Sequence, residues 1–414
     1  MSDDCRHISG AVEDMSNDKN QLFWYASSNA FWMGAYSLQQ ILVTWILVGQ
    51  LNESPERVGF AQMLIGIPGL VFMLWGGVIG DRMDVRVLLS RAHFFSAIPP
   101  LVLALVSIYG LIGYWILIAT ALFASLLNSA STPARATIIN TIAADRLQFA
   151  ITLSTGIGSI AAIAGTKLGG EMESVGLTTI LLVQSAVFAA GGLLTLCLKS
   201  VKPSQPIADT SVVATIKDGI AHVWQSHFAR NLIGLNFVSS LFNAGGWIVV
   251  IPFIVKRVYD GDAIFLANIM VIFTFGSLVS NFGLLKFMPL KYPGRLYLSM
   301  QLSRILILVL IWIQPDERFL WLAALLWGLN MGITTTTSRL MLQEVAETAY
   351  RARVMSIFQL SLLSAAPLGS LILGQIMGAW GPINALIPGI CASFVIFIVG
   401  FWMTDIWNYR SPGK

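Results

Sequence analysis

Long apolar runs, separated by short polar or charged stretches, follow one another along almost the whole chain. Twelve of these runs are long enough to cross a hydrocarbon core as a helix, which takes about 20 residues at 1.5 Å per residue. The predicted spans are 22–49, 58–80, 88–110, 113–132, 149–171, 177–198, 231–254, 264–285, 295–313, 319–338, 353–377 and 383–404. The pattern therefore predicts an all-α membrane protein with twelve transmembrane helices.

An internal repeat divides these spans into two halves. Arg135 and Arg339 each end a predicted helix, and the 204 positions between them also separate Gly165 from Gly369. We therefore predict two pseudo-symmetric six-helix bundles. The predicted divisions are a cytoplasmic tail at 1–21, bundles at 22–198 and 231–408, a cytoplasmic linker at 199–230 and a second cytoplasmic tail at 409–414.

The predicted linker carries apolar residues at helical spacing between Val212 and Trp224, with Lys217, Asp218 and His222 between them. That spacing predicts an amphipathic helix, which we expect to lie on the inner membrane surface. The expected role of this helix is a passive connection between the halves, and a regulatory role is the alternative.

The composition agrees with a membrane protein and excludes an ordinary soluble enzyme. Hydrophobic residues make up 56% of the 414 residues and charged residues 11%, whereas a soluble domain is about 25% charged. The sequence has no phosphate-binding glycine loop, no HExxH motif and no pair of histidines at ligand spacing. We therefore expect no enzyme activity, no cofactor, no metal and no nucleic-acid partner.

Basic residues are distributed unevenly between the two sides of the predicted topology. Nineteen of the 25 lysines and arginines lie on the side of the N-terminus, and four lie on the other side. Lysine and arginine concentrate on the cytoplasmic side of a membrane protein. We therefore expect a multi-pass protein of a bacterial inner (plasma) membrane with both termini in the cytoplasm.

A charged island, GGVIGDRMDVRVLLSR, joins the second and third predicted spans. Its key residues are Gly77, Gly80, Asp81, Arg82 and Arg86. The island resembles the signature loop of the major facilitator superfamily, and its D-R-x-D-x-R variant is similar to the drug- and siderophore-exporter branch, which includes the enterobactin exporter. The resemblance implies two bundles that rock around a central site, with the aspartate as a charge-assisted latch. Alternatively, the arginines only fix the topology.

A second motif lies in the fifth span, where four glycines recur at Gly156, Gly165, Gly169 and Gly170. They resemble the superfamily's exporter-associated glycine motif, with Thr166 in place of its proline. The resemblance implies an exporter rather than an importer. Small residues also let helices pack closely whatever the direction of transport, and this alternative stays open.

Polar side chains recur at helical spacing on the first, fourth, seventh and tenth spans. The candidate cavity residues are Asn29, Trp32, Tyr36, Gln40, Asn128, Asn236, Asn243 and Asn330. The resemblance places these four helices around a central substrate cavity, which fits because polar groups in a membrane must face protein or water. Amides beside aromatic rings suit a bulky amphipathic organic molecule. Ordinary hydrogen bonding between helices is the alternative for each residue.

Two cations fall inside predicted spans. Arg304 lies about 14 Å into the ninth span at 1.5 Å per residue, where a charge is costly and indicates either a substrate ligand or a hydrogen-bonded structural residue. We favour the structural role, because the resemblance places the ninth helix at the periphery. Lys167 lies near the end of the fifth span, where it faces the pathway, extends to the membrane surface or pairs with Glu171.

These observations predict a secondary-active transporter that works by alternating access in a lipid bilayer. We expect a monomeric exporter of small amphipathic organic molecules, either drugs or siderophores. Protons as the coupling ion are implied by the resemblance alone, since no carboxylate lies near the middle of a span. An uptake permease on the same fold is the first alternative. A non-transporting receptor is more remote, since it would be expected to carry a sizeable signalling domain.

Overall fold

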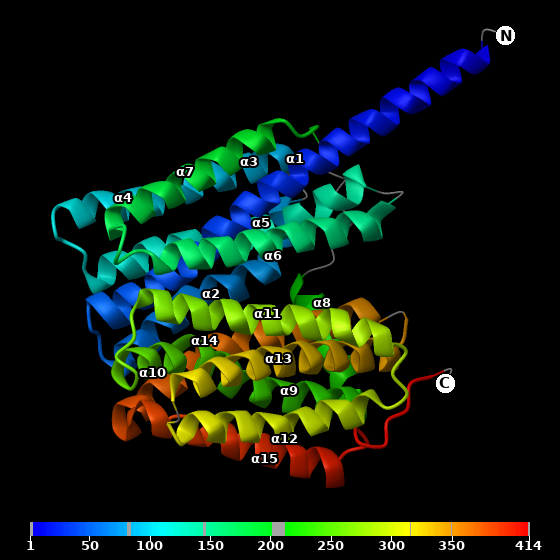
Figure 1. Cartoon of the computed structure of the whole chain (residues 1–414). Coiled ribbons are helices and arrows are strands. Elements are labelled where there is room, and N and C mark those ends of the chain that lie inside the picture. Colours follow the sequence, from blue (N-terminus) through cyan, green and yellow to red (C-terminus); the bar gives the residue numbers. More distant parts are fainter. Residues whose placement is uncertain are drawn as a thin grey trace. The chain divides into compact units, whose positions relative to one another are not determined.

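A computed structural model describes residues 3–80, 84–143, 146–200, 212–314, 316–348 and 350–412. At 3–19, 72–80 and 212–216 only the backbone is described. Side chains are described in the rest of these ranges. The described residues form helices joined by short turns, without a strand among them (Figure 1). The chain divides into two compact units, the first made of 1–43 and 71–209, and the second of 44–70 and 210–414.

The first unit contains the helices of the N-terminal part of the chain. They are α1 (Asp3–Trp45) as far as Val43, α2 (Pro55–Gly80) from Val71, α3 (Val85–Ser96), α4 (Ile98–Ile108), α5 (Tyr114–Ile142), α6 (Leu147–Gly170) and α7 (Leu177–Leu196). Helix α7 packs along α3 and α4, and α5 packs against α3.

The second unit contains the rest of the chain and the hairpin at 44–70. Its further elements are η1 (Ile46–Gln50), α8 (Val212–Gln225), α9 (His227–Gly245), η3 (Gly246–Val250), α10 (Ile251–Arg257), α11 (Ala263–Phe287), α12 (Pro293–Trp312), α13 (Glu317–Val345), α14 (Arg351–Asn384) and α15 (Ile387–Trp402). Helix α13 packs against α11 and α12, α14 packs along α9, and α15 packs along α12.

Ten helical stretches of the described residues are long and apolar enough to cross a membrane. The second and twelfth predicted spans are occupied by α2 and by the 16-residue α15. The prediction of an all-α membrane fold is confirmed. It succeeds because a chain in lipid must satisfy its backbone hydrogen bonds within each segment, so the apolar pattern fixes the secondary structure.

Proline and glycine residues interrupt the helices of two of these spans. The third span is divided at Ala97, because Pro99 and Pro100 follow it and cannot donate the backbone bonds of a continuous helix. In α14, Gly381 adopts φ +81°, a conformation that few other residues tolerate. This kink separates the eleventh and twelfth spans at the predicted place.

Several helix ends differ from the sequence prediction. Helix α1 begins at Asp3, so the helix continues through the segment predicted as a tail. Arg135 and Arg339 lie inside α5 and α13, which continue to Ile142 and Val345, and not at helix ends. The residues after each arginine continue without proline or glycine, so nothing in the sequence ends the helix there.

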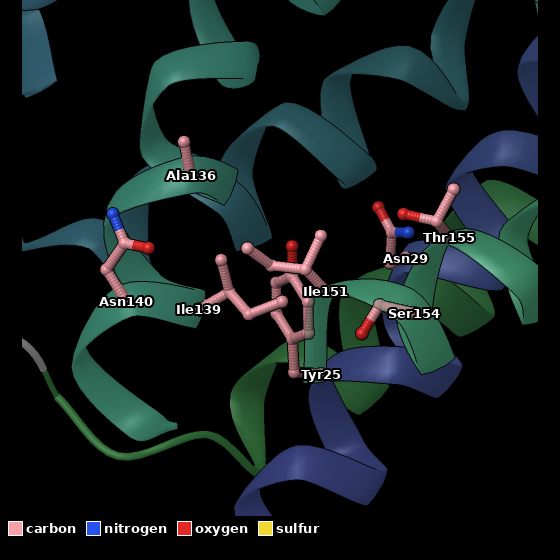
Figure 2. A pocket seen from close by; sticks show the side chains of 8 residues that line it. All are labelled: Tyr25, Asn29, Ala136, Ile139, Asn140, Ile151, Ser154 and Thr155. Atoms are coloured by element: carbon pink, nitrogen blue, oxygen red, sulfur yellow. The ribbon is translucent and has the colours of Figure 1, made fainter. Parts of the chain in front are cut away.

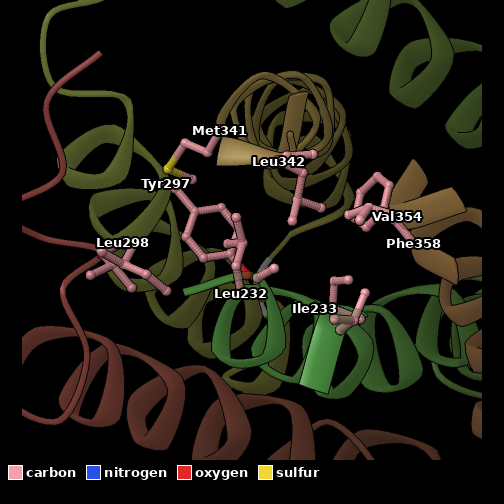
Figure 3. Close-up of a cluster of buried hydrophobic side chains, with 12 residues drawn as sticks. Leu232, Ile233, Tyr297, Leu298, Met341, Leu342, Val354 and Phe358 are labelled. Carbon is pink, nitrogen blue, oxygen red and sulfur yellow. The ribbon is translucent and has the colours of Figure 1, made fainter. Parts of the chain in front are cut away.

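The repeat is visible in the packing. The contact of α3 and α4 with α7 in the first unit corresponds to that of α12 with α15 in the second. Each unit also has an apolar core at equivalent positions. Ile138 and Ala150 lie in the core of the first unit, and Leu342 and Val354, each 204 positions later, lie in that of the second (Figure 3).

The predicted amphipathic helix is present as α8, and it packs on the second unit. Val223 enters the apolar core shown in Figure 3, and Gly219 lies against Ile357 of α14. Ile220 and Trp224 stay exposed, as a face in contact with the membrane surface would. The helix is therefore a docked element as well as a connection.

Candidate functional site

The signature loop is described only in part. Asp81 and Arg82 lie outside the described residues, and Gly77 and Gly80 lie in the last turns of α2. Arg86 is half-buried in the first turn of α3. The latch predicted for this loop therefore stays a prediction.

Asp84, which departs from the signature glycine, is the N-cap of α3. Its carboxylate accepts hydrogen bonds from the backbone N–H groups of Arg86 (2.9 Å) and Val87 (3.4 Å). The hydroxyl of Ser200 donates to its other oxygen. An aspartate here satisfies donors that a helix start leaves free and suits the positive end of the helix. Asp84 thus ties the start of α3 to the chain after α7.

The glycine motif of α6 packs against α1 within the first unit. A side chain at Gly165 would overlap the carbonyl oxygen of Gly34 and lie 2.8 Å from its carbonyl carbon. Gly169 faces Leu38 and Ile41 in the same way, and Gly170 is buried beside it. Gly156 does not join this contact, because a Cβ there would meet nothing within 4 Å.

The second unit repeats this contact. A Cβ at Gly369 would overlap the carbonyl oxygen of Leu241 and lie 2.8 Å from its carbonyl carbon. Gly369 lies on α14 and Leu241 on α9, the helices equivalent to α6 and α1. Close packing of these helix pairs is therefore a property of both units.

The predicted polar face of α1 is held to α5. The indole N–H of Trp32 donates to the side-chain oxygen of Asn128 (3.1 Å). The phenol of Tyr36 interacts with Asn128 and with Gln40. These four candidate residues therefore form one connected cluster, in which Trp32 is buried and Gln40 is exposed.

The fifth residue of this set, Asn29, lines a pocket of about 260 Å³ between α1, α5 and α6. The lining residues are Tyr25, Asn29, Ala136, Ile139, Asn140, Ile151, Ser154 and Thr155. Figure 2 shows Asn29, Ser154 and Thr155 on one side, with Tyr25, Ile139 and Ile151 between them and Asn140. Ser154 is 3% exposed, and its hydroxyl has no hydrogen-bond partner among the residues that the structure describes. The described lining residues are polar and apolar, and none of them carries a charge.

A buried histidine and arginine flank Trp32. The ring of His93 makes an edge-to-face contact with the indole at 4.9 Å, and the guanidinium of Arg135 lies over the indole at 4.1 Å. The Nε and one Nη of Arg135 are buried, and neither has a hydrogen-bond partner in the described part of the chain. The sequence analysis assigned neither residue to a site.

In the second unit, Arg304 is a buried residue held by amides and a hydroxyl. Its guanidinium donates to Ser239, to the Gln301 side chain (3.3 Å) and to Asn330 Oδ1 (2.9 Å). Asn330 in turn donates to the Met300 carbonyl (2.6 Å). These contacts are those that a structural role of Arg304 requires, and Asn330 takes part in them. The two roles predicted for Arg304 and the cavity role predicted for Asn330 stay predictions.

The other amides of the second unit are also buried. The indole of Trp327 donates to Asn243, and Trp327 meets Trp247 edge to face. The amide nitrogen of Asn236 has no hydrogen-bond partner. Lys167 is exposed in the last turn of α6. Of the candidate cavity residues, Asn29 and Asn236 therefore retain the most freedom to bind a ligand.

A family model described as the Major Facilitator Superfamily matches residues 25–370. The chain belongs to this superfamily. Among curated proteins, a sequence comparison finds no match.

Solved structures of superfamily-type transporters share the fold. The nucleoside transporter NupG has a TM-score of 0.73 at 14% identity, covering 95% of this chain and 99% of its own. The D-xylose-proton symporter has a TM-score of 0.71 at 12% identity, again covering 95% and 99%. A bacterial homolog of the human lysosomal transporter Spinster, in an inward-facing unoccupied conformation, has a TM-score of 0.71 at 13% identity with the same coverage.

Membership in the superfamily makes the chain a multi-pass membrane transporter of the secondary type, embedded in a lipid bilayer and acting on a small solute. The narrower resemblance to the drug- and siderophore-exporter branch receives no support from these comparisons, since the similar structures include nucleoside and xylose transporters. Sequence reasoning also missed Ser154, Arg135 and His93. A lone histidine inside an apolar run was the available signal for His93.

Proposed function

We propose that this superfamily member is an exporter of small, uncharged amphipathic organic molecules, driven by the proton gradient across a bacterial inner membrane. The pocket of the first unit carries the substrate part of this proposal. Its 260 Å³ suits part or all of a small organic molecule, and its lining offers amides and hydroxyls beside isoleucines. A buried hydroxyl without a partner, that of Ser154, is costly unless a ligand or water satisfies it.

The lack of charged side chains in this lining argues for a neutral ligand. A charged molecule leaving water would need an opposite charge in the site to offset its desolvation. The aromatic ring of Tyr25 and the side chains of Ile139 and Ile151 offer apolar surface to the rest of the molecule. A ligand with hydroxyl or amide groups on one side and a hydrocarbon or aromatic part on the other fits this arrangement.

The outward direction rests on the two sequence motifs. The signature variant D-R-x-D-x-R contains Asp84, whose position as the N-cap of α3 gives the exporter-type residue a physical purpose. The glycine motif supports the direction less, because Gly369 makes an equivalent contact in the other unit.

Inverted membrane vesicles test the direction and the substrate together. Respiration acidifies the lumen of such vesicles, so a proton-coupled exporter accumulates its substrate inside. We expect uptake of radiolabelled chloramphenicol, a neutral amphipathic molecule, that collapses when a protonophore is added. Enterobactin tests the siderophore alternative in the same vesicles. Equal labelling in vesicles with and without the protein, for both compounds, contradicts the proposal.

An uptake permease is the second candidate, favoured by the amide-rich lining of the pocket, which also suits a sugar or nucleoside. It predicts accumulation of uridine or D-xylose in right-side-out vesicles and none in inverted vesicles. For either direction, Ser154→Ala should weaken the apparent affinity about 5- to 10-fold, the value of one hydrogen bond. Thr152→Ala is the matched control, because this neighbouring hydroxyl bonds the carbonyl of Gln148 in its own helix (2.8 Å).

A further inference from the structure

His93 is a fully buried histidine whose two ring nitrogens both have partners. Its Nδ1 lies 3.2 Å from the carbonyl oxygen of Phe188 on α7, and its Nε2 lies 3.2 Å from the hydroxyl oxygen of Ser28 on α1. The Ser28 hydroxyl lies 2.6 Å from that of Thr195, which donates to the carbonyl of Gly191 (2.8 Å). A chain of hydrogen bonds therefore runs from α3 through α1 to α7.

The partners fix where a proton can be gained. A carbonyl oxygen only accepts, so Nδ1 must carry a hydrogen in every state, and Nε2 is the nitrogen that is either bare or protonated. When Nε2 is protonated, it donates to Ser28, Ser28 donates to Thr195 and Thr195 donates to Gly191. When Nε2 is bare, Ser28 donates to it and Thr195 donates to Ser28. Rotation of two hydroxyls thus accommodates both states of the ring.

The surroundings of His93 also contain a group that responds to its charge. Arg135 of α5 is the charged side chain that acts on the ring, and it lies over Trp32, the same indole that His93 contacts. The other groups facing the ring, from α1 and α7, are hydroxyls, a carbonyl and the indole. An imidazolium would repel the guanidinium, which lies against the Trp32 indole and has two buried nitrogens with no hydrogen-bond partner among the described residues.

We propose that His93 is a proton-binding site inside the first unit, with Ser28 and Thr195 as its hydroxyl relay and Arg135 as the group that senses its charge. Trp32 links this site to the polar cluster, since its indole N–H donates to Asn128. The role of His93 in coupling rests on the proposed function. Proton binding itself does not, and it can be tested without a substrate.

The experiment uses the full-length protein in lipid, labelled with ¹⁵N-histidine and titrated by NMR from pH 5 to 9. The chain has four histidines, at 7, 93, 222 and 227, so the variant His7→Gln/His222→Gln/His227→Gln leaves the ring of His93 as the one signal. This variant keeps the site intact. We expect the signal of bare Nε2 to be replaced by that of a protonated nitrogen as the pH is lowered.

Two further substitutions in this background test the relay and the sensor. Ser28→Ala should move the midpoint down by about one pH unit, because a hydrogen bond from a charged donor is stronger than one to a neutral ring. Arg135→Gln should move it up by about one unit, because a neighbouring cation is lost. Ser185→Ala is the control. It removes a hydroxyl that donates to the carbonyl of Ala97 (2.9 Å), outside the relay, and it should leave the midpoint unchanged.

The outcomes separate the proposals. A bare Nε2 signal that persists to pH 5 overturns the proton site, whatever is transported. Titration with a midpoint that neither Ser28→Ala nor Arg135→Gln moves overturns the relay and the sensor. If no compound accumulates in the vesicle assay, the proposed function is overturned, whereas the result of the histidine titration is unaffected.

Discussion

The closest helix contact of the first unit gives the sharpest prediction about stability. Gly165→Ala places a methyl group 2.8 Å from the carbonyl carbon of Gly34, whereas ordinary contacts of this kind begin near 3.4 Å. The obstacle is backbone, which cannot rotate away as a side chain would. Helices α1 and α6 must therefore separate by at least about 0.6 Å at this point, because the carbonyl oxygen of Gly34 lies closer still.

The cost of that separation follows from how steeply packing energy falls with distance. A gap of about 0.5–1 Å forfeits a quarter to a half of the attraction between the atoms on either side. Gly169 against Leu38 and Ile41 belongs to the same contact and loosens with it. Overpacking typically costs about 1–3 kcal/mol, and we expect the upper end here because the obstacle is rigid. For a cooperative unit of about 150–250 residues, the size range of the first unit, each kcal/mol lowers the melting temperature by about 2–4 °C, so its unfolding should shift down by about 6–12 °C.

The chain supplies a matched control on the same helix. Gly156→Ala adds the same methyl group where nothing lies within 4 Å, and alanine is the better helix former by about 0.5–1 kcal/mol. Its melting temperature should stay unchanged or rise by about 1–3 °C. Gly369→Ala and Gly234→Ala form the corresponding pair in the second unit, because Gly369 abuts Leu241 and Gly234 faces open space.

Thermal unfolding of the purified protein in detergent, followed by size-exclusion chromatography with fluorescence detection, measures all four variants. We expect Gly165→Ala and Gly369→Ala to melt at a lower temperature than the unsubstituted protein. We expect no such decrease for Gly156→Ala and Gly234→Ala. If Gly165→Ala, Gly156→Ala and the unsubstituted protein all melt at the same temperature, then α1 and α6 do not approach each other as closely as they do in the structure.

Three further predictions concern other parts of the chain. Asp84→Ala removes the N-cap of α3 and the acceptor of Ser200, and it should cost about 1 kcal/mol in thermal unfolding, whereas Asp84→Asn should recover most of the loss. Arg304→Ala leaves three acceptors without their donor but also removes a charge from the membrane, so we expect it to lower the free energy of unfolding by about 1–2 kcal/mol. The transport affinity of the protein that remains folded should be unchanged. A reporter active only in the periplasm should be silent when fused after Lys202 and active in the loop at Asp260, and the opposite pattern would overturn the orientation.

The sequence predicts the helices well because their cause is local. Apolar length and basic flanks reflect the bilayer acting on each segment separately. The N-cap at Asp84 was also readable, since an aspartate directly before an amphipathic run is a capping signal.

The partners of the buried polar groups could not be predicted, because their cause is long-range. Arg304 meets Ser239, which is 65 positions away, and His93 meets Ser28 at the same separation. Helical spacing shows which side chains share a face of one helix, as for Trp32 and Tyr36. It does not show which neighbouring helix that face meets, and that neighbour decides whether an amide lines a cavity or serves a buried arginine.

Thr166 shows how a departure from a family pattern acquires a physical meaning once its neighbours are known. The exporter motif has a proline at this position, which would remove a backbone donor near the C-terminal end of α6. Thr166 instead keeps the helix continuous to Gly170, donates to the carbonyl of Ala162 (3.0 Å) and meets the hydroxyl of Ser37 on α1 (2.7 Å). Where a proline would bend the helix, Thr166 therefore makes a hydrogen-bonded contact with α1 beside Gly165. Since Gly369 makes the equivalent contact in the other unit, packing within a bundle accounts for Gly165 and Thr166, and the proposed outward direction rests mainly on the signature loop.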